Sequence, residues 1–295
     1  MTPRRISPIW LVLAGIASVQ LGAAVAKHLF GRIEPTTMVW LRLVTSSVVL
    51  LAVARPRLRG RSRDDWVTVV AFGLVLGSMN WAIYQSFARI PLGLAVTIEF
   101  AGPLVLAVVT SRQARDLLWV ALAALGVGLL GFERTELDLA GVGFALLAGA
   151  AWAAYILLSA RTGRSWPGLD GLAMASVVAT LVLTPFALHL FEGARGDGAL
   201  GDPTILVLGA AVGLLSSVIP YSAELMALRS IRPGVFSILM SLEPAAAALA
   251  GMVVLHEFLS VLQWVAVAAV MVASVGATRG HADAPGGGIG EPVPD

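Results

Sequence analysis

The chain has 295 residues, of which 58% are hydrophobic and only 13% are charged. Soluble domains carry about 25% charged residues, so a water-soluble fold of this size would lack polar surface. The chain has no cysteine, which excludes disulfides, thiolate metal sites and cysteine nucleophiles. Its one lysine, Lys27, precedes His28 rather than Ser or Thr, which excludes a phosphate-binding P-loop. The composition predicts an all-α integral membrane protein with no metal and no cofactor.

Apolar segments long enough to cross a bilayer, which takes about 20 residues per helix, follow one another through most of the chain. Charged clusters and turn residues separate ten of them, at 8–30, 37–54, 66–88, 93–111, 116–133, 140–160, 168–190, 204–228, 234–255 and 260–278. No window has the alternating pattern of a membrane β-barrel strand. Residues 1–7 form a short N-terminal segment. The Gly- and Pro-rich tail, 279–295, is expected to be disordered.

The first apolar run follows Arg4 and Arg5 and contains small residues near Ala23, a pattern that signal peptides share. The run is about 20 residues long, which exceeds a typical signal-peptide core. Nine segments of similar character follow it. We therefore expect an uncleaved first span.

The distribution of arginine predicts the orientation in the membrane. If the N-terminus is cytoplasmic, the loops allocate fourteen arginines to the cytoplasm and four to the exterior. An excess of basic residues marks cytoplasmic loops, so both termini are expected in the cytoplasm of a multi-pass plasma (inner) membrane protein. The run from Arg55 to Arg63 also fits a nucleic-acid patch, but a topology anchor explains it without any nucleic-acid partner.

The two halves of the chain resemble each other. The segment Gly93–Pro103 (GLAVTIEFAGP) corresponds to Gly234–Pro244 (GVFSILMSLEP) at an offset of 141 residues. Five spans per half is an odd number, so the halves must lie in opposite orientations. The sequence therefore predicts two inverted five-helix repeats, 8–133 and 140–278, an architecture used by many transporters.

Small residues are abundant, with 31 glycines in the chain. The third and eighth spans each contain a GxxxG pair, Gly73/Gly77 and Gly209/Gly213. In lipid, small residues let helix backbones approach closely. We expect most of these glycines to serve helix packing.

Ionisable residues within spans cost a few kcal/mol each to insert and are functional candidates by default. Glu243 lies mid-span before Pro244, whose missing N–H frees the carbonyl of Met240. The Glu243 carboxylate is a candidate to bind an ammonium group or a proton. The alternative is that it is held neutral or caps the helix kink. Glu99 precedes Pro103 by one turn, and an ion pair with Arg42 is as plausible as a substrate role. Glu224 and Lys27 lie nearer span ends, where snorkelling to water is the simpler interpretation.

Neutral polar residues in the spans complete the candidate site. They are Gln20, Asn80, Tyr84, Tyr155 and Tyr221. A pocket for a small zwitterion needs a carboxylate for the ammonium group and donors for the carboxylate, and these residues with Arg42 and the glutamates provide both. A pocket for flat aromatic molecules would instead use Trp81 and Trp152.

The segments Gly93–Pro103 and Gly234–Pro244 resemble EamA-type transporters of the drug/metabolite transporter superfamily. IPLGLAVTIEFAGPL, WAAYILLSARTG and IPYSAELMALRSI are similar to its threonine/homoserine exporter branch, and the resemblance covers about 8–278. It implies a ten-span inverted repeat in which spans 1, 3, 4, 6, 8 and 9 surround a central cavity, with spans 5 and 10 at the periphery. The cavity-lining, substrate-binding candidates carried over are Gln20, Asn80, Tyr84, Glu99, Tyr155, Tyr221, Glu224, Met240 and Glu243.

The resulting hypothesis is an exporter of small amino acids, threonine or homoserine first, that works by alternating access and is driven by an ion gradient or by the solute's own gradient. Protons are a candidate coupling ion through Glu243 first and Glu99 second, and a homodimer stays open. The alternatives are export of drug-like or purine metabolites, an intramembrane enzyme, and a non-transporting sensor. The spans contain no His/Asp/Glu set with metal spacing and no Ser/His pair, so an enzyme is not expected.

Overall fold

The computed structural model describes residues 7–110, 116–129, 138–192, 199–228, 230–231 and 233–282. Within these ranges all regular structure is helical. Nine helical stretches of this part are long and apolar enough to span a membrane, and Leu117–Leu129 is a shorter apolar helix. The described part of the chain is therefore all-α, with the helix lengths of a multi-pass membrane protein, as the composition predicts.

The helices follow the order expected from the apolar segments. The α-helices are α1 (Pro8–His28), α2 (Pro35–Ala54), α3 (Arg63–Phe87), α4 (Leu92–Glu99), α5 (Ala101–Thr110), α6 (Asp116–Leu129), α7 (Leu139–Thr162), α8 (Asp170–Glu192), α9 (Pro203–Gly213), α10 (Ile219–Leu228), α11 (Pro233–Met240), α12 (Glu243–Ala250) and α13 (Val261–Ala282). Short helical turns are η1 (Leu29–Gly31), η3 (Ala199–Gly201), η4 (Leu214–Val218) and η5 (Gly251–Leu255).

Local sequence explains where several helices begin. Ser62 and Asp65 form a reciprocal capping box at the start of α3, and Asp138 accepts hydrogen bonds from two backbone N–H groups at the start of α7. Asp202 does the same for Thr204 at the start of α9. These side chains satisfy N–H groups that have no partner inside the helix.

Two stretches that the sequence predicts as single spans are broken near their middle. The first break separates α4 from α5 at Phe100, and the second separates α11 from α12 at Ser241 and Leu242. Each break is linked to a proline, Pro103 or Pro244, because proline cannot donate the backbone hydrogen bond that would continue the helix. As a result Glu99 ends α4 and Glu243 begins α12.

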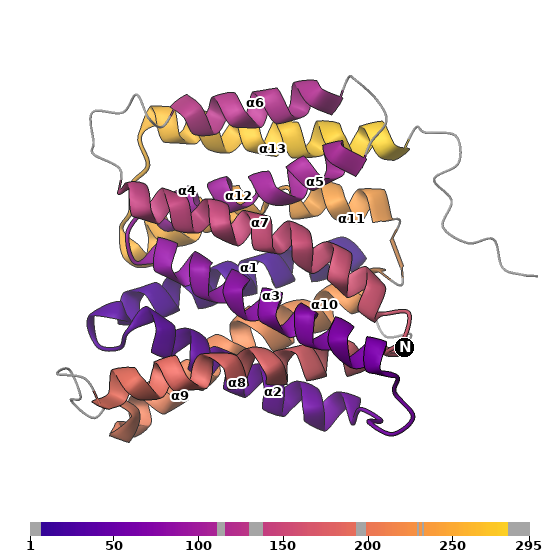
Figure 1. Ribbon diagram of the computed structural model, residues 1–295. Coiled ribbons are helices and arrows are strands. Elements are labelled where there is room, and N and C mark those ends of the chain that lie inside the picture. Colours follow the sequence, from indigo (N-terminus) through magenta and orange to yellow (C-terminus); the bar gives the residue numbers. More distant parts are fainter. Residues whose placement is uncertain are drawn as a thin grey trace, which may run out of the picture.

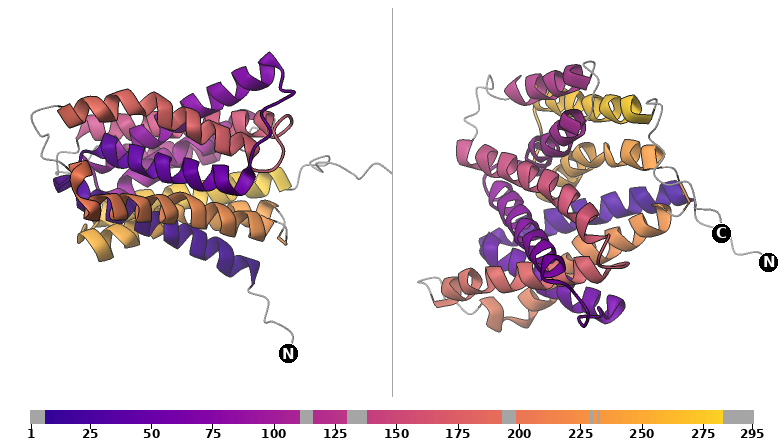
Figure 2. Two further views of the ribbon diagram at one scale, coloured as in Figure 1. Left: turned by 90° about the horizontal axis from the view of Figure 1, so that it is seen from below. Right: turned by 45° about the vertical axis from the view of Figure 1, so that its right-hand side comes forward.

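The helices lie roughly side by side (Figures 1 and 2). α6 packs on α13 at one edge of the bundle, and α2, α8 and α9 pack together at the opposite edge. Between these edges α3 packs against α7, α1 packs against α10 and α12, and α4 packs against α12. The central helices α1, α3, α4, α7, α10 and α12 thus surround the middle of the molecule.

Glycines lie at several close helix contacts, as expected. A methyl group at Gly102 of α5 would lie 1.9 Å from the Gly149 carbonyl oxygen of α7. One at Gly73 of α3 would lie 2.5 Å from Val178 of α8, and one at Gly209 of α9 would lie 2.7 Å from Leu41 of α2. These helices can approach only because the glycines carry no side chain.

One predicted span ends earlier than its helix does, and the end of another lies outside the described residues. α13 continues to Ala282, past the expected end of the tenth span at residue 278. The expected fifth span, 116–133, is described only as α6, and its last residues lie outside the described part, as does the tail from residue 283. A helix end depends on local hydrogen bonding, which apolar run length alone does not reveal.

Candidate functional site

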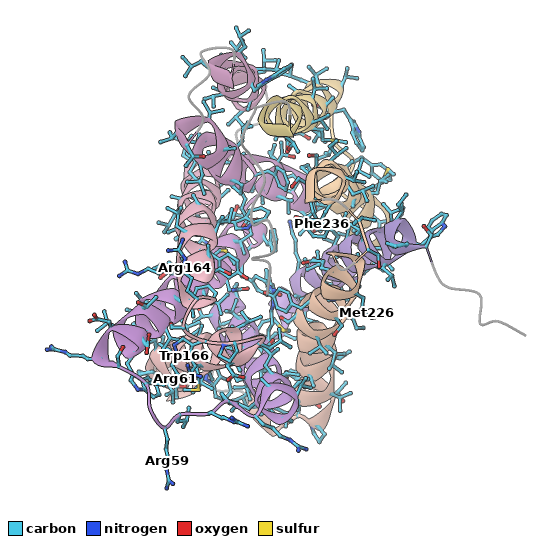
Figure 3. All side chains as sticks on the ribbon, turned by 90° about the vertical axis from the view of Figure 1, so that its right-hand side faces the viewer. Arg59, Arg61, Arg164, Trp166, Met226 and Phe236 are labelled. Atoms are coloured by element: carbon cyan, nitrogen blue, oxygen red, sulfur yellow. The ribbon has the colours of Figure 1, made fainter. Side chains whose placement is uncertain are left out.

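A cavity of about 460 Å³ lies among the central helices. One part of the cavity, near Arg42 and Phe87, lies toward the end of the bundle where α3 stops. The other part reaches Ala107 of α5 and Thr278 of α13, near the opposite end of the bundle. Phe236 in the first turn of α11 also lines the cavity, and Figure 3 looks onto this opposite end, with Phe236 and Met226 labelled.

Three carboxyl groups line the cavity. Glu99 comes from the end of α4, Glu224 from α10 and Glu243 from the start of α12. Glu243 lies within electrostatic reach of both other glutamates. None of the three is in an ion pair within the described part of the chain. Like charges sharing one cavity repel each other, so a cation that enters would relieve the repulsion.

Arg42 of α2 brings one guanidinium group to the same cavity. Its Nε donates to Ser217 Oγ at 3.4 Å, its Nη2 donates to the Ser216 carbonyl oxygen at 3.0 Å, and its Nη1 donates to Tyr84 Oη at 3.4 Å. A guanidinium has five N–H groups, so one on each terminal nitrogen has no acceptor within the described residues and can bind an anionic group. Arg42 and Glu99 form no ion pair within this part of the chain, although the two side chains interact electrostatically.

The aromatic hydroxyls divide into two groups. Tyr155 of α7 and Tyr221 of α10 line the cavity and interact with each other. Tyr84 does not line it: the side chain is fully buried behind Arg42, whose guanidinium lies 5.5 Å from the Tyr84 ring centre. The expectation that Tyr84 lines the cavity is therefore wrong, because Phe30 and Phe87 pack on its ring.

The other expected residues lie at the cavity. Gln20, Asn80 and Met240 line it. Asn80 donates one hydrogen bond to the Leu76 carbonyl oxygen at 2.8 Å within its own helix. Trp152 also lines the cavity, with its ring 5.2 Å from that of Phe100 in an edge-to-face arrangement, whereas Trp81 packs against Phe144 elsewhere.

Sequence reasoning did not identify several further residues at this site. Ser216 lines the cavity, and Ser217 holds Arg42 in place. Ser237 and Ser274 also line the cavity. Serines are frequent in packed membrane helices, so nothing in the sequence separates these from the rest.

Lys27 was expected to reach water, and this expectation is wrong as well. Its Nζ lies 2.5 Å from Glu257 Oε1 and donates to the Ile90 carbonyl oxygen at 2.7 Å. Glu257 lies in the short connection between η5 and α13, outside the predicted spans.

The described residues contain no group of three or more His, Cys, Asp or Glu side chains placed to hold a metal ion. The cavity instead combines one guanidinium, three carboxyl groups and aromatic hydroxyls. Such a set can bind a small polar molecule that carries both charges, without any bond being broken.

Several proteins of similar sequence are named as transporters or exporters. A family profile described as the EamA-like transporter family matches residues 139–279. The threonine/homoserine exporters RhtA of Escherichia coli (strain K12) and Salmonella typhimurium (strain LT2) are each 38% identical to this chain, with 92% of each protein covered. The uncharacterized transporter YwfM of Bacillus subtilis is 30% identical over 78% of this chain and 79% of its own.

A solved crystal structure of a protein at 18% identity aligns with a TM-score of 0.61, covering 92% of this chain and 96% of that one. At this identity the alignment supports the fold alone. The relatives at 38% identity carry the family assignment, and they are named as exporters rather than as enzymes. The chain thus belongs to the EamA-like transporter family, as an RhtA-like multi-pass membrane transporter.

Proposed function

We propose that this protein exports small amino acids, with threonine and homoserine first, across the plasma membrane by alternating access. The observation that carries the proposal is the joint presence of Arg42 and three carboxyl groups at one cavity. An α-amino acid carries a carboxylate and an ammonium group, which these side chains complement. The cavity volume of about 460 Å³ falls within the usual range of small-molecule sites.

The proposed scaffold has ten spans in two inverted repeats, 8–133 and 140–278. The helix breaks support it, since Phe100 and Ser241 are separated by the same 141 residues that relate the sequence motifs. Helix packing supports it too. The contact of α3 with α7 corresponds to the contact of α10, in the eighth span, with α1. The contact of α2 with α9 likewise corresponds to the contact of α8 with α3. Each pair becomes the other when the two halves are exchanged.

This pairing supports alternating access. Because α3 packs on α7 and α1 packs on α10, each contact joins one half of the chain to the other. The cavity lies between these cross-half units, so a small rotation of one unit against the other would close one end of the cavity and open the other. Transporters with inverted repeats use this kind of motion.

In the proposed orientation both termini lie in the cytoplasm. Arg59, Arg61 and Arg164 gather at one end of the bundle (Figure 3), which supports a cytoplasmic location of that end. The cavity reaches the same end through Phe236. A cytoplasmic amino acid would therefore have access to Arg42 and the glutamates.

Proton coupling through Glu243 belongs to the same proposal. Glu243 begins the half-helix α12 and shares the cavity with Glu99 and Glu224. A proton on one carboxyl group reduces the repulsion among the three and leaves the others to hold the ammonium group. Exchange of that proton against substrate would couple efflux to the proton gradient.

The direct experiment is efflux of labelled threonine and homoserine from preloaded cells that lack their own exporters, with and without this protein. We expect faster efflux that a protonophore abolishes. Unchanged efflux of both amino acids, with the protein detected in the membrane, would refute this substrate assignment while leaving the fold intact.

Glu243→Gln tests the coupling. We expect the variant to lose the pH dependence of efflux, because the amide cannot exchange a proton, while Glu243→Asp keeps it in part. Wild-type efflux by Glu243→Gln at every pH would contradict this role for Glu243.

A second candidate function is export of flat aromatic metabolites such as purines, which the Trp152 and Phe100 rings at the cavity favour. A competition screen across chemical types separates the two candidates. Efflux of labelled threonine that other amino acids slow supports the first, and efflux of a labelled purine that amino acids do not slow supports the second.

A further inference from the structure

Lys27 and Glu257 join three segments of the chain at one end of the bundle. Lys27 lies at the end of α1, and its Nζ contacts Glu257 Oε1 at 2.5 Å. The same ammonium group donates to the Ile90 carbonyl oxygen at 2.7 Å, and the Leu92 N–H donates to Glu257 Oε2 at 2.8 Å. One ion pair therefore ties α1, the turn between α3 and α4, and the connection between η5 and α13.

This tie lies at the end of the bundle where α1 stops and α4 begins. Ala23, one helical turn before Lys27 on the same face of α1, lines the cavity. Between the cavity and this end, Phe87, Ile90 and Leu92 are buried. The opposite end differs, because Ile156 and Ser237 line the cavity there and are exposed.

The tie also joins the two halves of the chain. Lys27 and Leu92 belong to the first half and Glu257 to the second. The side chains of Lys27 and Glu257 are only 16% and 21% exposed, so their attraction is less weakened by water than that of a surface pair. Moving α1 and α4 away from the start of α13 would separate these groups.

We propose that the Lys27–Glu257 ion pair is the latch that closes the cavity at the end where α1 stops and α4 begins, and that it must break before this end can open. The inference rests on the proposed alternating-access function and assigns these residues a positioning role rather than a substrate contact. In the latched state the cavity is accessible only from the end that carries Arg59 and Arg164.

Opening is possible because both partners can be satisfied once separated. Lys27 is at the last turn of α1 and Glu257 lies in a connection between helices, so both can reach water when the end opens. The Leu92 N–H lies in the first turn of α4, where an N–H group has no partner inside the helix and can also bind water. The latch thus biases the equilibrium toward one state without preventing the other.

A comparable ion pair at the same end provides a matched control. Arg32 Nη2 lies 3.1 Å from Asp202 Oδ2 and also joins the two halves. Its side chains are 56% and 35% exposed, and neither residue lines the cavity. Removing this pair should leave access to the cavity unchanged.

The test uses the natural absence of cysteine. Ala23→Cys places one thiol in the cavity beneath the latch, and a membrane-impermeant maleimide is added from the latch side. Gly31→Cys, which has open space around it, reports labelling from the latch side. Arg59→Cys reports labelling from the opposite side. The two reporters identify the latch side whatever the orientation in the membrane.

We expect slow labelling of the Ala23→Cys thiol from the latch side in the latched protein, and labelling about tenfold faster after Lys27→Met or Glu257→Gln, a typical size for coupling between sites. The double variant, which leaves no lone charge, should behave like either single variant, because all three remove the same contact. Arg32→Gln should leave the rate unchanged. Threonine efflux is measured in parallel on the same variants.

Equal labelling of the Ala23→Cys thiol in the latched protein and in the double variant would overturn the latch, and so would an equal effect of Arg32→Gln. If threonine efflux continues in that case, the transport proposal stands without the latch. Faster labelling of the latch variants without efflux of any tested amino acid would support the latch and refute the proposed substrate.

Discussion

Charged side chains inside the spans have two kinds of environment. Arg42 is held by three acceptors, from Ser216, Ser217 and Tyr84. Glu99 and Glu243 are in no ion pair within the described residues and face the cavity instead. A guanidinium fixed by neutral groups keeps its charge for a ligand, and an unpaired carboxyl group keeps its capacity for a cation.

Arg42→Lys tests the geometry of the guanidinium. Lysine retains the charge but cannot hold Ser216, Ser217 and a ligand carboxylate with one planar group. We expect efflux to fall by about tenfold or more, which corresponds to about 1.4 kcal/mol, with a melting temperature close to wild type in detergent. Efflux at the wild-type rate would show that charge alone suffices at this position.

The tyrosines should separate by their position relative to the cavity. Tyr221→Phe removes a hydroxyl that lines the cavity and should raise the half-saturating threonine concentration about three- to tenfold, as expected for one lost hydrogen bond. Tyr84→Phe should change it less than about twofold, because its hydroxyl makes only a long contact to Arg42 behind the cavity. The reverse order would place the substrate on the far side of Arg42.

Helix breaks and glycine contacts belong together at the scale of the elements. The α4–α5 break lies where Gly102 and Gly149 bring α5 and α7 into backbone contact. Pro103 leaves the Glu99 carbonyl without its helical partner, and a methyl group at Gly149 would lie 2.6 Å from that oxygen. The crossing with α7 thus holds the backbone at the point where Glu99 enters the cavity.

Gly149→Ala should therefore destabilise the protein, because the new methyl group would overlap the Glu99 carbonyl oxygen. We expect a loss of about 1–3 kcal/mol, the usual cost of overpacking, measured as a lower melting temperature in detergent. Gly143→Ala is the matched control in the same helix, since a methyl group there has no neighbour within 4 Å. Equal melting temperatures of the two variants would argue against a tight crossing.

At the scale of the whole molecule, packing between the two halves dominates the centre of the bundle. α3 with α7, α1 with α10, and α4 with α12 each join residues far apart in sequence. The described ion pairs also join the halves: Arg61–Asp170 at one end, and Lys27–Glu257 and Arg32–Asp202 at the other. Large movements are therefore expected between units built from both halves.

The proposed topology gives a prediction of its own. In intact cells, an impermeant maleimide should label Gly31→Cys and should label Arg59→Cys only after the membrane is permeabilised. The arginine distribution is the physical reason, because basic loops are retained in the cytoplasm. The opposite labelling pattern would invert the topology and turn the proposed exporter cavity toward the exterior.

The amino-acid sequence by itself determined the class of the protein and the residues worth testing. Run length and hydropathy predicted the spans because every backbone group in a bilayer must be satisfied within its own helix, which makes span prediction a local problem. Nine of the ten expected spans are present as membrane-length helices in the described residues, and the fifth is seen as the shorter α6. Glu99, Glu243 and Arg42 could likewise be recognised as functional candidates from the sequence, because a charged residue within an apolar span is costly to insert into lipid.

Only the tertiary structure decided which of these groups meet. The π-helical turn η4 supplies acceptors for Arg42 through Ser216 and Ser217, and Phe30 and Phe87 enclose Tyr84 behind it. Lys27 and Glu257 are 230 residues apart and form an ion pair only because the two halves pack against each other. Contacts between distant residues depend on how helices rotate and cross, and apolar periodicity in a uniformly apolar chain does not specify that rotation.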